Sequence, residues 1–472
     1  MKIKFKKDFW WGAATSGPQT EGRFDKNELS IMDYWYQNNP EDFFDQIGPN
    51  ITSDVYHKYK EDIKLMEKIN LNSFRTSIQW TRLMKDVEKG EVDNDAVAFY
   101  RDYFSSFKKA NIKLVVNLFH FDMPIKFENI GGFANFDVVD AFVNYAETCF
   151  KLFGDLVDYW TTFNEPVVPI EGCYLYKWYY PKIVDFKLGI QAAFGTILAN
   201  AKVVNLFHKM FSTDNNKRIG IILNVTPTYP ASNEIQDIKA AKIRDQLFNR
   251  VFLDTAVKGR FNDDLIKLLK DDQLLPKYQI NDLKEINNAK VDFLGINYYQ
   301  PVRVQAPIKI WNDIEPIMPE KWFEKYESPE RRINPSRGWE IYPSAIFEIG
   351  EIIKNEYNNI PWFISENGIG IANEELWKNE SGQIQDDYRI EFISEHLYWL
   401  NKTIQNGSNC FGYHMWTFVD CWSWANAYKN RYGFVSLNLE TQKRTLKKSA
   451  YWFKKIISND GEIEILDNVF KN

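Results

Sequence analysis

The sequence is poor in the side chains that bind metals and form disulfides. Its four cysteines have neither the spacing of a metal site nor that of a disulfide framework: Cys149, Cys173, Cys410 and Cys421. The five histidines are scattered in the same way: His57, His120, His208, His396 and His414. Glycine-rich phosphate loops and dinucleotide-binding fingerprints are also missing. We therefore expect reduced thiols, no metal site and no cofactor.

Long apolar runs are missing as well. Four lysines in the first seven residues precede the apolar run Phe9–Ala14, which is too short for a signal peptide and is followed at once by polar residues. No stretch approaches the ~20 apolar residues of a membrane span. We therefore expect a cytoplasmic protein with no membrane partner.

An excess of positive charge is absent too. The 472 residues carry a formal net charge of −6, which argues against a nucleic-acid-binding surface. Linkers, low-complexity segments and short-period repeats are not found. The remaining expectation is a globular protein whose partner is a small-molecule substrate; the sequence is silent on its oligomeric state.

Aromatic residues are abundant, at 16% of the chain with Trp 16 and Tyr 25. One interpretation is a well-filled core. The other is that some rings stack on sugars, since an aromatic face covers the apolar C–H face of a pyranose. Composition alone leaves both interpretations open.

Short apolar runs alternate with longer amphipathic segments along the chain. The predicted strands are Phe9–Ala14, Ser73–Ser77, Lys113–Leu118, Asp158–Asn164, Ile219–Asn224, Phe293–Asn297, Trp362–Ser365 and Gly412–Trp416. The predicted helices are Asp54–Lys68, Val138–Phe153, Ile190–Met210, Gln236–Val257, Asp386–Ile404 and Arg444–Ile457. Eight strands alternating with helices predict an α/β fold, a (β/α)₈ TIM barrel.

A bare barrel needs only ~250 residues, so the excess length predicts long βα loops on one domain spanning residues 1–472. The longest predicted loop runs from about Gln300 to Pro343. A long irregular loop in a compact domain is usually functional, commonly as a wall or lid.

Two glutamates follow predicted strands: Glu165 in T-F-N-E-P at 162–166, and Glu366 in I-S-E-N-G at 364–368. Carboxylates at the C-terminal ends of barrel strands are typical of catalysis, and two of them can face one another across the barrel mouth. Glycosidic bond cleavage requires such a pair. One carboxyl group protonates the leaving oxygen, and the other attacks the anomeric carbon or activates water.

Further polar or aromatic residues fall at the ends of the other predicted strands. They are Gln19, Arg75, His120, Asn164, Asn224, Asn297, Tyr299 and Trp416. Gln, His and Asn can bind sugar hydroxyls as donors or acceptors, and Trp416 could form the floor of a sugar site. Arg75 could hold Glu366 ionised and Tyr299 could donate to it, although Arg75 could equally form a strand-end salt bridge.

The motifs together resemble those of glycoside hydrolase family 1. They are F-W-W-G-A-A-T at 9–15, Q-T-E-G at 19–22, L-F-H-F-D-M-P at 118–124, T-F-N-E-P, G-I-N-Y-Y at 295–299, S-E-N-G and R-Y-G-F at 431–434. The resemblance spans nearly the whole chain in the family's order. It implies a retaining β-glycosidase with Glu165 as acid/base and Glu366 as nucleophile. It also implies a sugar site lined by Gln19, His120, Asn164, Asn224, Asn297, Tyr299 and Trp416.

The sequence departs from the family pattern beside the sugar site and after the eighth strand. Pro18 stands where an aromatic residue or Asn is usual, and Phe121 where Trp is usual. Members acting on plain sugars usually have N-F-E-W after the eighth strand, whereas this chain has C-W-S-W at 421–424. Ser423 thus replaces a carboxylate that would repel a phosphate on the sugar's C6.

In this region the chain resembles the family's 6-phosphoglycosidases, which have Ser here and then Lys, one residue and Tyr. Tyr432 matches the Tyr, but Asn430 occupies the Lys position and Lys429 precedes it. Lys429 could reach the pocket or be a solvated loop lysine. Trp424 is more typical of phosphogalactosidases.

The resulting prediction is a 6-phospho-β-glucosidase. A 6-phospho-β-galactosidase and a β-glucosidase for plain sugars are the alternatives, and a non-catalytic sugar-binding barrel is a remote one. The aglycone cannot be read from the sequence.

Overall fold

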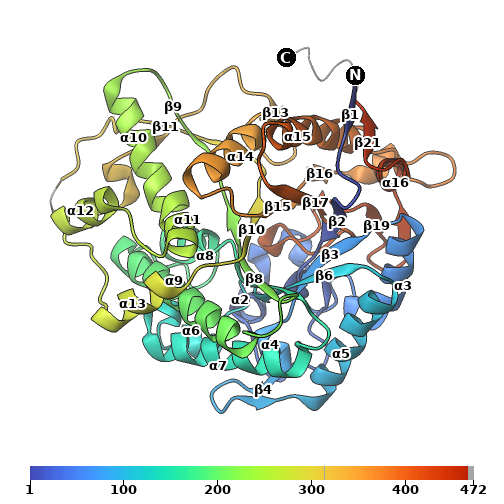
Figure 1. The fold of residues 1–472 in the computed structure, drawn as a ribbon, viewed down its shortest axis with the longest axis horizontal. Helices are drawn as coiled ribbons and strands as arrows, with labels where there is room; N and C mark the ends of the chain where they lie inside the picture. Colours follow the sequence, from blue (N-terminus) through green and yellow to red (C-terminus); the bar gives the residue numbers. More distant parts are fainter. Residues whose placement is uncertain (313, 466–472) are drawn as a thin grey trace.

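Eight parallel strands close into a barrel at the centre of the molecule (Figure 1). The computed structural model describes residues 1–312 and 314–465. The barrel strands are β2 (Trp10–Ala14), β3 (Ser73–Ser77), β6 (Lys113–Phe119), β7 (Tyr159–Asn164), β8 (Arg218–Asn224), β10 (Phe293–Asn297), β15 (Trp362–Asn367) and β17 (Cys410–Trp416). They neighbour one another in this order, and β17 pairs with β2 to close the barrel. The predicted (β/α)₈ fold is confirmed, and each predicted strand lies within two residues of the observed one.

Most of the barrel strands are largely apolar because both of their faces are buried, whereas β3, with the sequence S-F-R-T-S, is buried but mostly polar. At the N-terminal end of the barrel, Trp10, Val115, Phe293 and Phe363 form a separate apolar cluster. Gly412 makes room for Trp10, since a Cβ atom at this glycine would lie 2.7 Å from the Trp10 Cβ. Side chains therefore fill this end, and the space for a ligand lies at the other.

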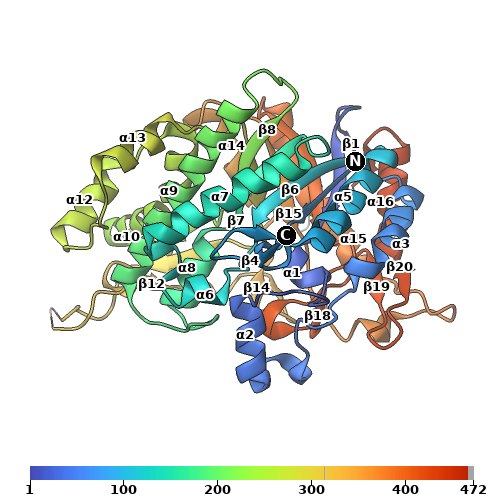
Figure 2. The same ribbon diagram turned by 90° about the horizontal axis from the view of Figure 1, so that it is seen from below.

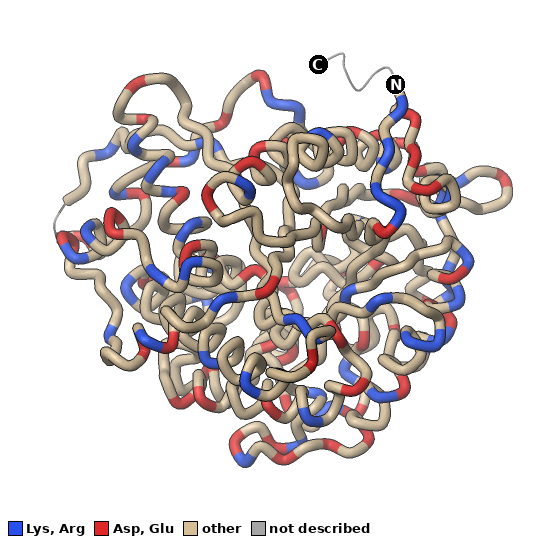
Figure 3. Tube along the Cα trace, viewed as in Figure 1, with Lys and Arg blue, Asp and Glu red and all other residues tan. Residues whose placement is uncertain are grey.

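Helices surround the barrel. The larger ones are α3 (Val55–Lys68), α5 (Asn94–Lys109), α7 (Phe136–Phe153), α9 (Phe186–Met210), α10 (Ile235–Asp245), α14 (Ala345–Glu356), α15 (Asp387–Gln405) and α16 (Lys448–Ser458). From α10 the chain continues through two π-helical turns, η4 (Gln246–Arg250) and η5 (Asp254–Lys258), with α11 (Val251–Leu253) between them. Figure 3 shows Lys and Arg intermixed with Asp and Glu over these outer helices.

The predicted helices are confirmed with shifted ends. The last begins at Lys448 because Arg444–Leu446 forms β20, which pairs with β19 (Val435–Leu437). Helices α5 and α14 were not predicted. For α5 the signal is present: the Asp93 carboxylate accepts from the backbone N–H of Asp95 at 2.9 Å and of Ala96 at 3.1 Å.

Helix α9 bears on the expectation that no segment spans a membrane. Its 25 residues have a mean hydropathy of 1.2 over the most apolar window, so by length and composition it could cross a membrane. In the structure 72% of that window is buried inside the protein. Core helices of globular proteins are apolar for this reason.

Shorter helices complete the framework. They are α1 (Gly17–Thr20), α2 (Ile31–Asn38), η1 (Pro40–Asp42), η2 (Phe44–Gln46), α4 (Trp80–Leu83), α6 (Ile125–Glu128), η3 (Gly132–Ala134), α8 (Val167–Tyr174), α12 (Asp263–Asp271), α13 (Ile280–Asn288), η6 (Pro319–Lys321), η7 (Glu374–Trp377) and η8 (Trp424–Asn426).

The loops that follow the barrel strands carry short strands of their own. They are β4 (Met84–Asp86), β5 (Glu91–Val92), β9 (Thr228–Pro230), β11 (Val302–Gln305), β12 (Glu324–Lys325), β13 (Ile333–Asn334), β14 (Trp339–Glu340), β16 (Ile371–Ala372) and β18 (Asn430–Arg431). A further pair, β1 (Lys2–Lys4) and β21 (Glu462–Glu464), joins the two ends of the described chain. Figure 2 shows α2, β14 and β18 gathered at one end of the barrel. The predicted loop from Gln300 to Pro343 is thus partly ordered into β11–β14.

Candidate active site

A cavity of about 520 Å³ opens at the C-terminal ends of the barrel strands. It is lined by most of the residues that the sequence singled out: Gln19, His120, Asn164, Glu165, Asn224, Tyr299, Glu366, Trp416, Ser423, Trp424 and Tyr432. They come from different strands or from the loops that follow them, and only the closure of the barrel brings them together. Three predicted residues lie outside the cavity wall: Arg75, Asn297 and Lys429.

Glu366 is buried between a cation and a hydroxyl donor. Arg75 on β3 is fully buried and forms an ion pair with the Glu366 carboxylate of β15. The Tyr299 hydroxyl donates to the other oxygen, Oε2, at 2.5 Å. Burial, and then the Glu366 charge, raise the pKa of Tyr299 well above its usual value, so the phenol remains a donor. The two contacts fix the Glu366 carboxylate in one orientation.

Glu165 lies in a different environment. Its Oε1 accepts a hydrogen bond from the Asn297 amide at 2.8 Å, with no cation paired to it among the described residues. Burial, and then the negative charge of Glu366, raise the pKa of Glu165. Glu165 is therefore held protonated at neutral pH beside the ion-paired Glu366, an arrangement that suits an acid next to a nucleophile.

The backbone at Glu165 also sets the direction of its side chain. Its φ of 46° lies in the left-handed region, which is costly for a residue with a side chain. Its N–H bonds to the Ile222 carbonyl at 2.9 Å, which anchors the strand end against β8.

Asn297 and Arg75 lie behind the wall and act on the residues that line it. Asn297 donates to Asn164 Oδ1 at 3.1 Å as well as to Glu165, and Ser365 Oγ donates to its Oδ1 at 2.7 Å. The resemblance implied that Asn297 lines the sugar site; the structure places it one layer deeper, where it orients the two wall residues.

His120 is buried beside Arg75. Burial, and then the Arg75 charge, lower the pKa of His120 well below its usual value. Its ring is therefore neutral near pH 7 and can bind a sugar hydroxyl without adding charge.

Only some of the residues predicted in the loop after β17 reach the cavity. Ser423, Trp424 and Tyr432 lie on the cavity wall. Lys429 is exposed, and its Nζ lies 5.6 Å from the centroid of the Phe44 ring outside the cavity. Asn430 is buried on β18. The structure therefore does not bring Lys429 to the site.

The cavity wall also contains residues that sequence reasoning missed. Arg337 and Trp339 come from the segment predicted as a wall or lid, so the length of that segment was the available signal. Glu171 and Arg244 lie on α8 and α10. Burial raises the pKa of Glu171 to about 7, against the opposing charge of Arg244.

Some aromatic residues fill the core and others line the cavity, so both interpretations of their abundance apply. Trp35, Trp80, Trp160, Trp362 and Trp422 are fully buried in the core. Others line the cavity: Trp178, Tyr179, Trp339, Trp416 and Trp424. Those on the wall are available to stack on a sugar or on its leaving group.

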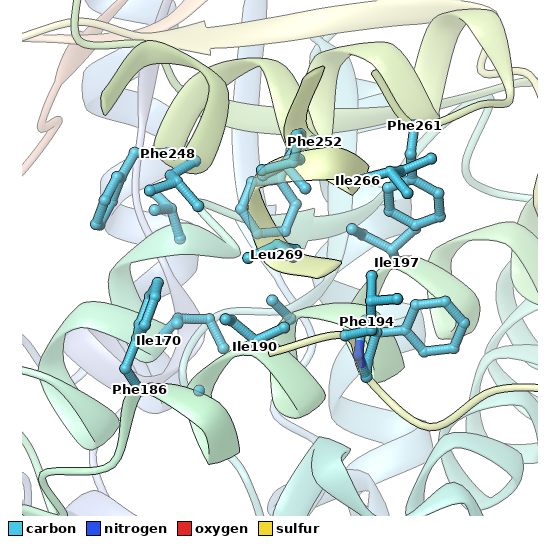
Figure 4. Close-up of a pocket in the computed structure, with 18 of the residues that line it drawn as sticks. Ile170, Phe186, Ile190, Phe194, Ile197, Phe248, Phe252, Phe261, Ile266 and Leu269 are labelled. Atoms are coloured by element: carbon cyan, nitrogen blue, oxygen red, sulfur yellow. The ribbon is translucent and has the colours of Figure 1, made fainter. Parts of the chain in front are cut away.

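A second cavity, of about 150 Å³, lies outside the barrel (Figure 4). Phe186, Ile190 and Phe194 of α9 face Phe252 and Leu269 across it. Its lining is almost entirely apolar and contains no carboxylate. It therefore lacks the groups that acid–base chemistry needs, and the polar cavity is the candidate active site.

Comparison with known proteins agrees with this geometry. The model of glycosyl hydrolase family 1 matches residues 1–462. The chain is 49% identical over 463 residues to the 6-phospho-β-glucosidase GmuD of Bacillus subtilis, covering 98% of this chain and 99% of that protein. It is 34% identical to the 6-phospho-β-galactosidase of Leptotrichia buccalis, covering 97% and 99%.

Among solved structures, a family 1 β-glucosidase from Thermotoga maritima is similar with a TM-score of 0.88 and 29% identity, covering 98% of this chain and 99% of that one. The same enzyme has been solved in complex with glucoimidazole. The match runs through the barrel, both glutamates and the loops around them, and this chain belongs to glycosyl hydrolase family 1.

Proposed function

We propose that this protein hydrolyses the β-glycosidic bond of 6-phospho-β-glucosides with retention of configuration. The observation that carries the proposal is the position of the Ser423 and Tyr432 hydroxyls on the same cavity wall as Glu165 and Glu366. A hydroxyl can donate to a phosphate, whereas a carboxylate in its place would repel it. The name of the Bacillus subtilis relative supports the same substrate class.

In the first step, the Glu366 carboxylate attacks the anomeric carbon while Glu165 gives its proton to the leaving oxygen. The product of this step is a covalent glycosyl–enzyme in which Glu366 no longer carries a negative charge. Because that charge helps to raise the pKa of Glu165, its loss lowers the pKa. Glu165 then acts as the base that activates water for the second step.

The other wall residues hold the sugar. Gln19, His120, Asn164 and Asn224 supply donors and acceptors for hydroxyl groups, and Trp416 supplies an apolar face. Gln19 is itself fixed, since its Nε2 donates to the Trp422 carbonyl at 3.0 Å. Arg75 lies behind the cavity wall and supports catalysis by pairing its positive charge with the Glu366 carboxylate.

A 6-phospho-β-galactosidase is the second candidate. Trp424, the residue type more typical of phosphogalactosidases, lies on the cavity wall. The Leptotrichia buccalis relative is named a 6-phospho-β-galactosidase. The two activities differ in the configuration of one hydroxyl group, so the same site can be tested for both.

We also propose that the chain is one domain with a small-molecule substrate and works in the cytoplasm. One barrel and one family model that matches residues 1–462 support the first part. All four cysteines are free and buried, which is consistent with a reducing compartment.

The test is a comparison of kcat/KM on nitrophenyl β-glucoside, nitrophenyl β-galactoside and their 6-phosphates. We expect the glucoside 6-phosphate to be the best substrate, by several orders of magnitude over the plain glucoside. Each hydrogen bond to a charged group contributes roughly 1.5–3 kcal/mol, and Ser423 and Tyr432 offer two such bonds. Ser423→Glu should reduce the rate on the phosphorylated substrates far more than on the plain ones. Equal wild-type rates on plain and phosphorylated glycosides would refute the phosphate preference.

A further inference from the structure

A cation that the sequence motifs do not include lies on the wall of the active-site cavity. Arg337 is in the turn between β13 and β14, and it lines the same cavity as Ser423, Tyr432 and Glu366. Its guanidinium group lies 4.3 Å from the centroid of the Trp339 ring, which holds it by a cation–π contact.

Among the described residues, Arg337 differs from its neighbours in having no carboxylate partner. Arg331 forms an ion pair with Glu327, and Arg303 forms one with Glu340 at 2.8 Å. In the part of the chain that the structure describes, no ion pair involves Arg337, and its buried Nε has no hydrogen-bond partner. A guanidinium group with unused donors on a cavity wall is suited to bind an anion there.

The hairpin that carries Arg337 is tied to the backbone next to Tyr432. Asn334 Nδ2 donates to the Gly370 carbonyl at 3.0 Å, and the Ala372 N–H bonds to Ser336 Oγ at 3.1 Å. Ala372 belongs to β16, which pairs with β18 immediately before Tyr432. The position of Arg337 relative to Tyr432 is therefore fixed by hydrogen bonds across three segments.

The charge of Arg337 is felt at Tyr432. Burial raises the pKa of Tyr432, and the Arg337 charge is the main influence that opposes this rise. Arg337 is thus close enough to influence Tyr432, and both line the cavity that Ser423 also lines.

We propose that Arg337 binds the 6-phosphate of the substrate and supplies the positive charge that neither Asn430 nor Lys429 brings to the cavity. This inference rests on the proposed phosphoglycosidase function. A guanidinium group can bind two phosphate oxygens at once, and stacking on Trp339 presets its plane. Specificity for the phosphate then comes from the β13–β14 hairpin, in addition to the loop after β17.

The test compares wild type, Arg337→Met and Arg337→Lys on nitrophenyl β-glucoside 6-phosphate and on nitrophenyl β-glucoside. Both substrates have the same leaving group, so a contact of Arg337 with the leaving group affects them equally. We expect Arg337→Met to lower kcat/KM for the phosphate about 10- to 100-fold, mainly through KM, as for a lost charged hydrogen bond. The plain glucoside should change less than about threefold, and Arg337→Lys should recover part of the loss.

Arg331→Met is the matched control, because it removes an arginine of the same segment that pairs with Glu327 outside the cavity. It should leave both rates unchanged. Competitive inhibition gives a second readout: Arg337→Met should weaken inhibition by glucose 6-phosphate and leave inhibition by glucose unchanged.

An equal loss on both substrates, or no loss on either, would overturn the assignment of Arg337. If wild type prefers the phosphate but Arg337→Met keeps the same preference, only this inference fails. If wild type shows no preference for the phosphate, the proposed function fails before the variants are compared.

Discussion

At the scale of single residues, the site separates two identical side chains by their surroundings. Glu366 is paired with a buried arginine and accepts from a tyrosine. Among the described residues, the Glu165 carboxyl group accepts only from an amide, and it lies near the negative charge of Glu366. The nucleophile must be charged and the acid must be protonated, so these surroundings support our proposal of Glu366 as the nucleophile and Glu165 as the acid.

Azide rescue tests this assignment. Glu366→Gly should lose nearly all turnover and recover it with azide, which fills the vacated space and gives an α-glycosyl azide. In Glu165→Ala the turnover rate on substrates with poor leaving groups should fall about 10²–10⁴-fold, because these substrates need a proton. The rate on dinitrophenyl glycosides should fall much less. With azide this variant should give a β-glycosyl azide. Proton NMR of the products checks both, and the opposite pair of anomers would mean that the roles are reversed.

The pH profile tests the protonation state of Glu165. Because its pKa is raised, first by burial and then by Glu366, its proton is present at neutral pH and is lost as the pH rises through that pKa. The kcat/KM value should therefore fall on the basic side. In Glu165→Gln, assayed on a dinitrophenyl glycoside that needs no proton, this basic limb should disappear. If the limb persists in that variant, another group sets it.

At the scale of elements, the loop after β17 is held by a buried network of charges. Lys447 Nζ donates to Asp420 at 2.9 Å and also pairs with Glu374, and all three are almost fully buried. Asp420 in turn accepts from the Gly433 N–H at 2.8 Å, next to Tyr432. Burial by itself would raise the pKa of Asp420, but the charges of Lys447 and Arg431 lower it.

Lys447→Met should therefore be strongly destabilising, since it leaves two buried carboxylates without this cation. We expect a loss of about 3–5 kcal/mol in the free energy of unfolding at pH 7, measured by urea denaturation. Lys448→Met is the control: Lys448 pairs with Asp387 on the surface, at 43% and 57% side-chain exposure, so its loss should be under about 1 kcal/mol. Similar losses in the two variants would contradict a structural role for the buried network.

The barrel strands and the segment from Gln300 to Pro343 differ in how far the sequence predicts them. Most of the barrel strands were predictable because they are short, largely apolar runs buried on both faces. The short strands between Gln300 and Pro343 were not predictable, because their order comes from tertiary contacts. Strand β11 pairs with β9 and β12, and β13 pairs with β14. Arg337 reaches the cavity only through this folding, and no local pattern around it indicates a ligand.

At the scale of the whole molecule, the two ends of the barrel have different tasks. Large apolar side chains such as Trp10 and Phe363 close the N-terminal end, and the functional groups gather at the C-terminal end. The residues that end the strands were predictable because parallel strands all deliver their last residues to the same rim. Which of these side chains reach the cavity was not predictable: Asn297 lies behind the wall, and Lys429 faces outward.

The central claim is that this barrel cleaves a 6-phospho-β-glucoside in two displacements at Glu366. The most direct measurement is proton NMR of the first sugar product from nitrophenyl β-glucoside 6-phosphate, recorded before mutarotation. The account predicts that β-glucose 6-phosphate appears first and that the α-anomer follows only as the product mutarotates. Release of α-glucose 6-phosphate as the first product would contradict it.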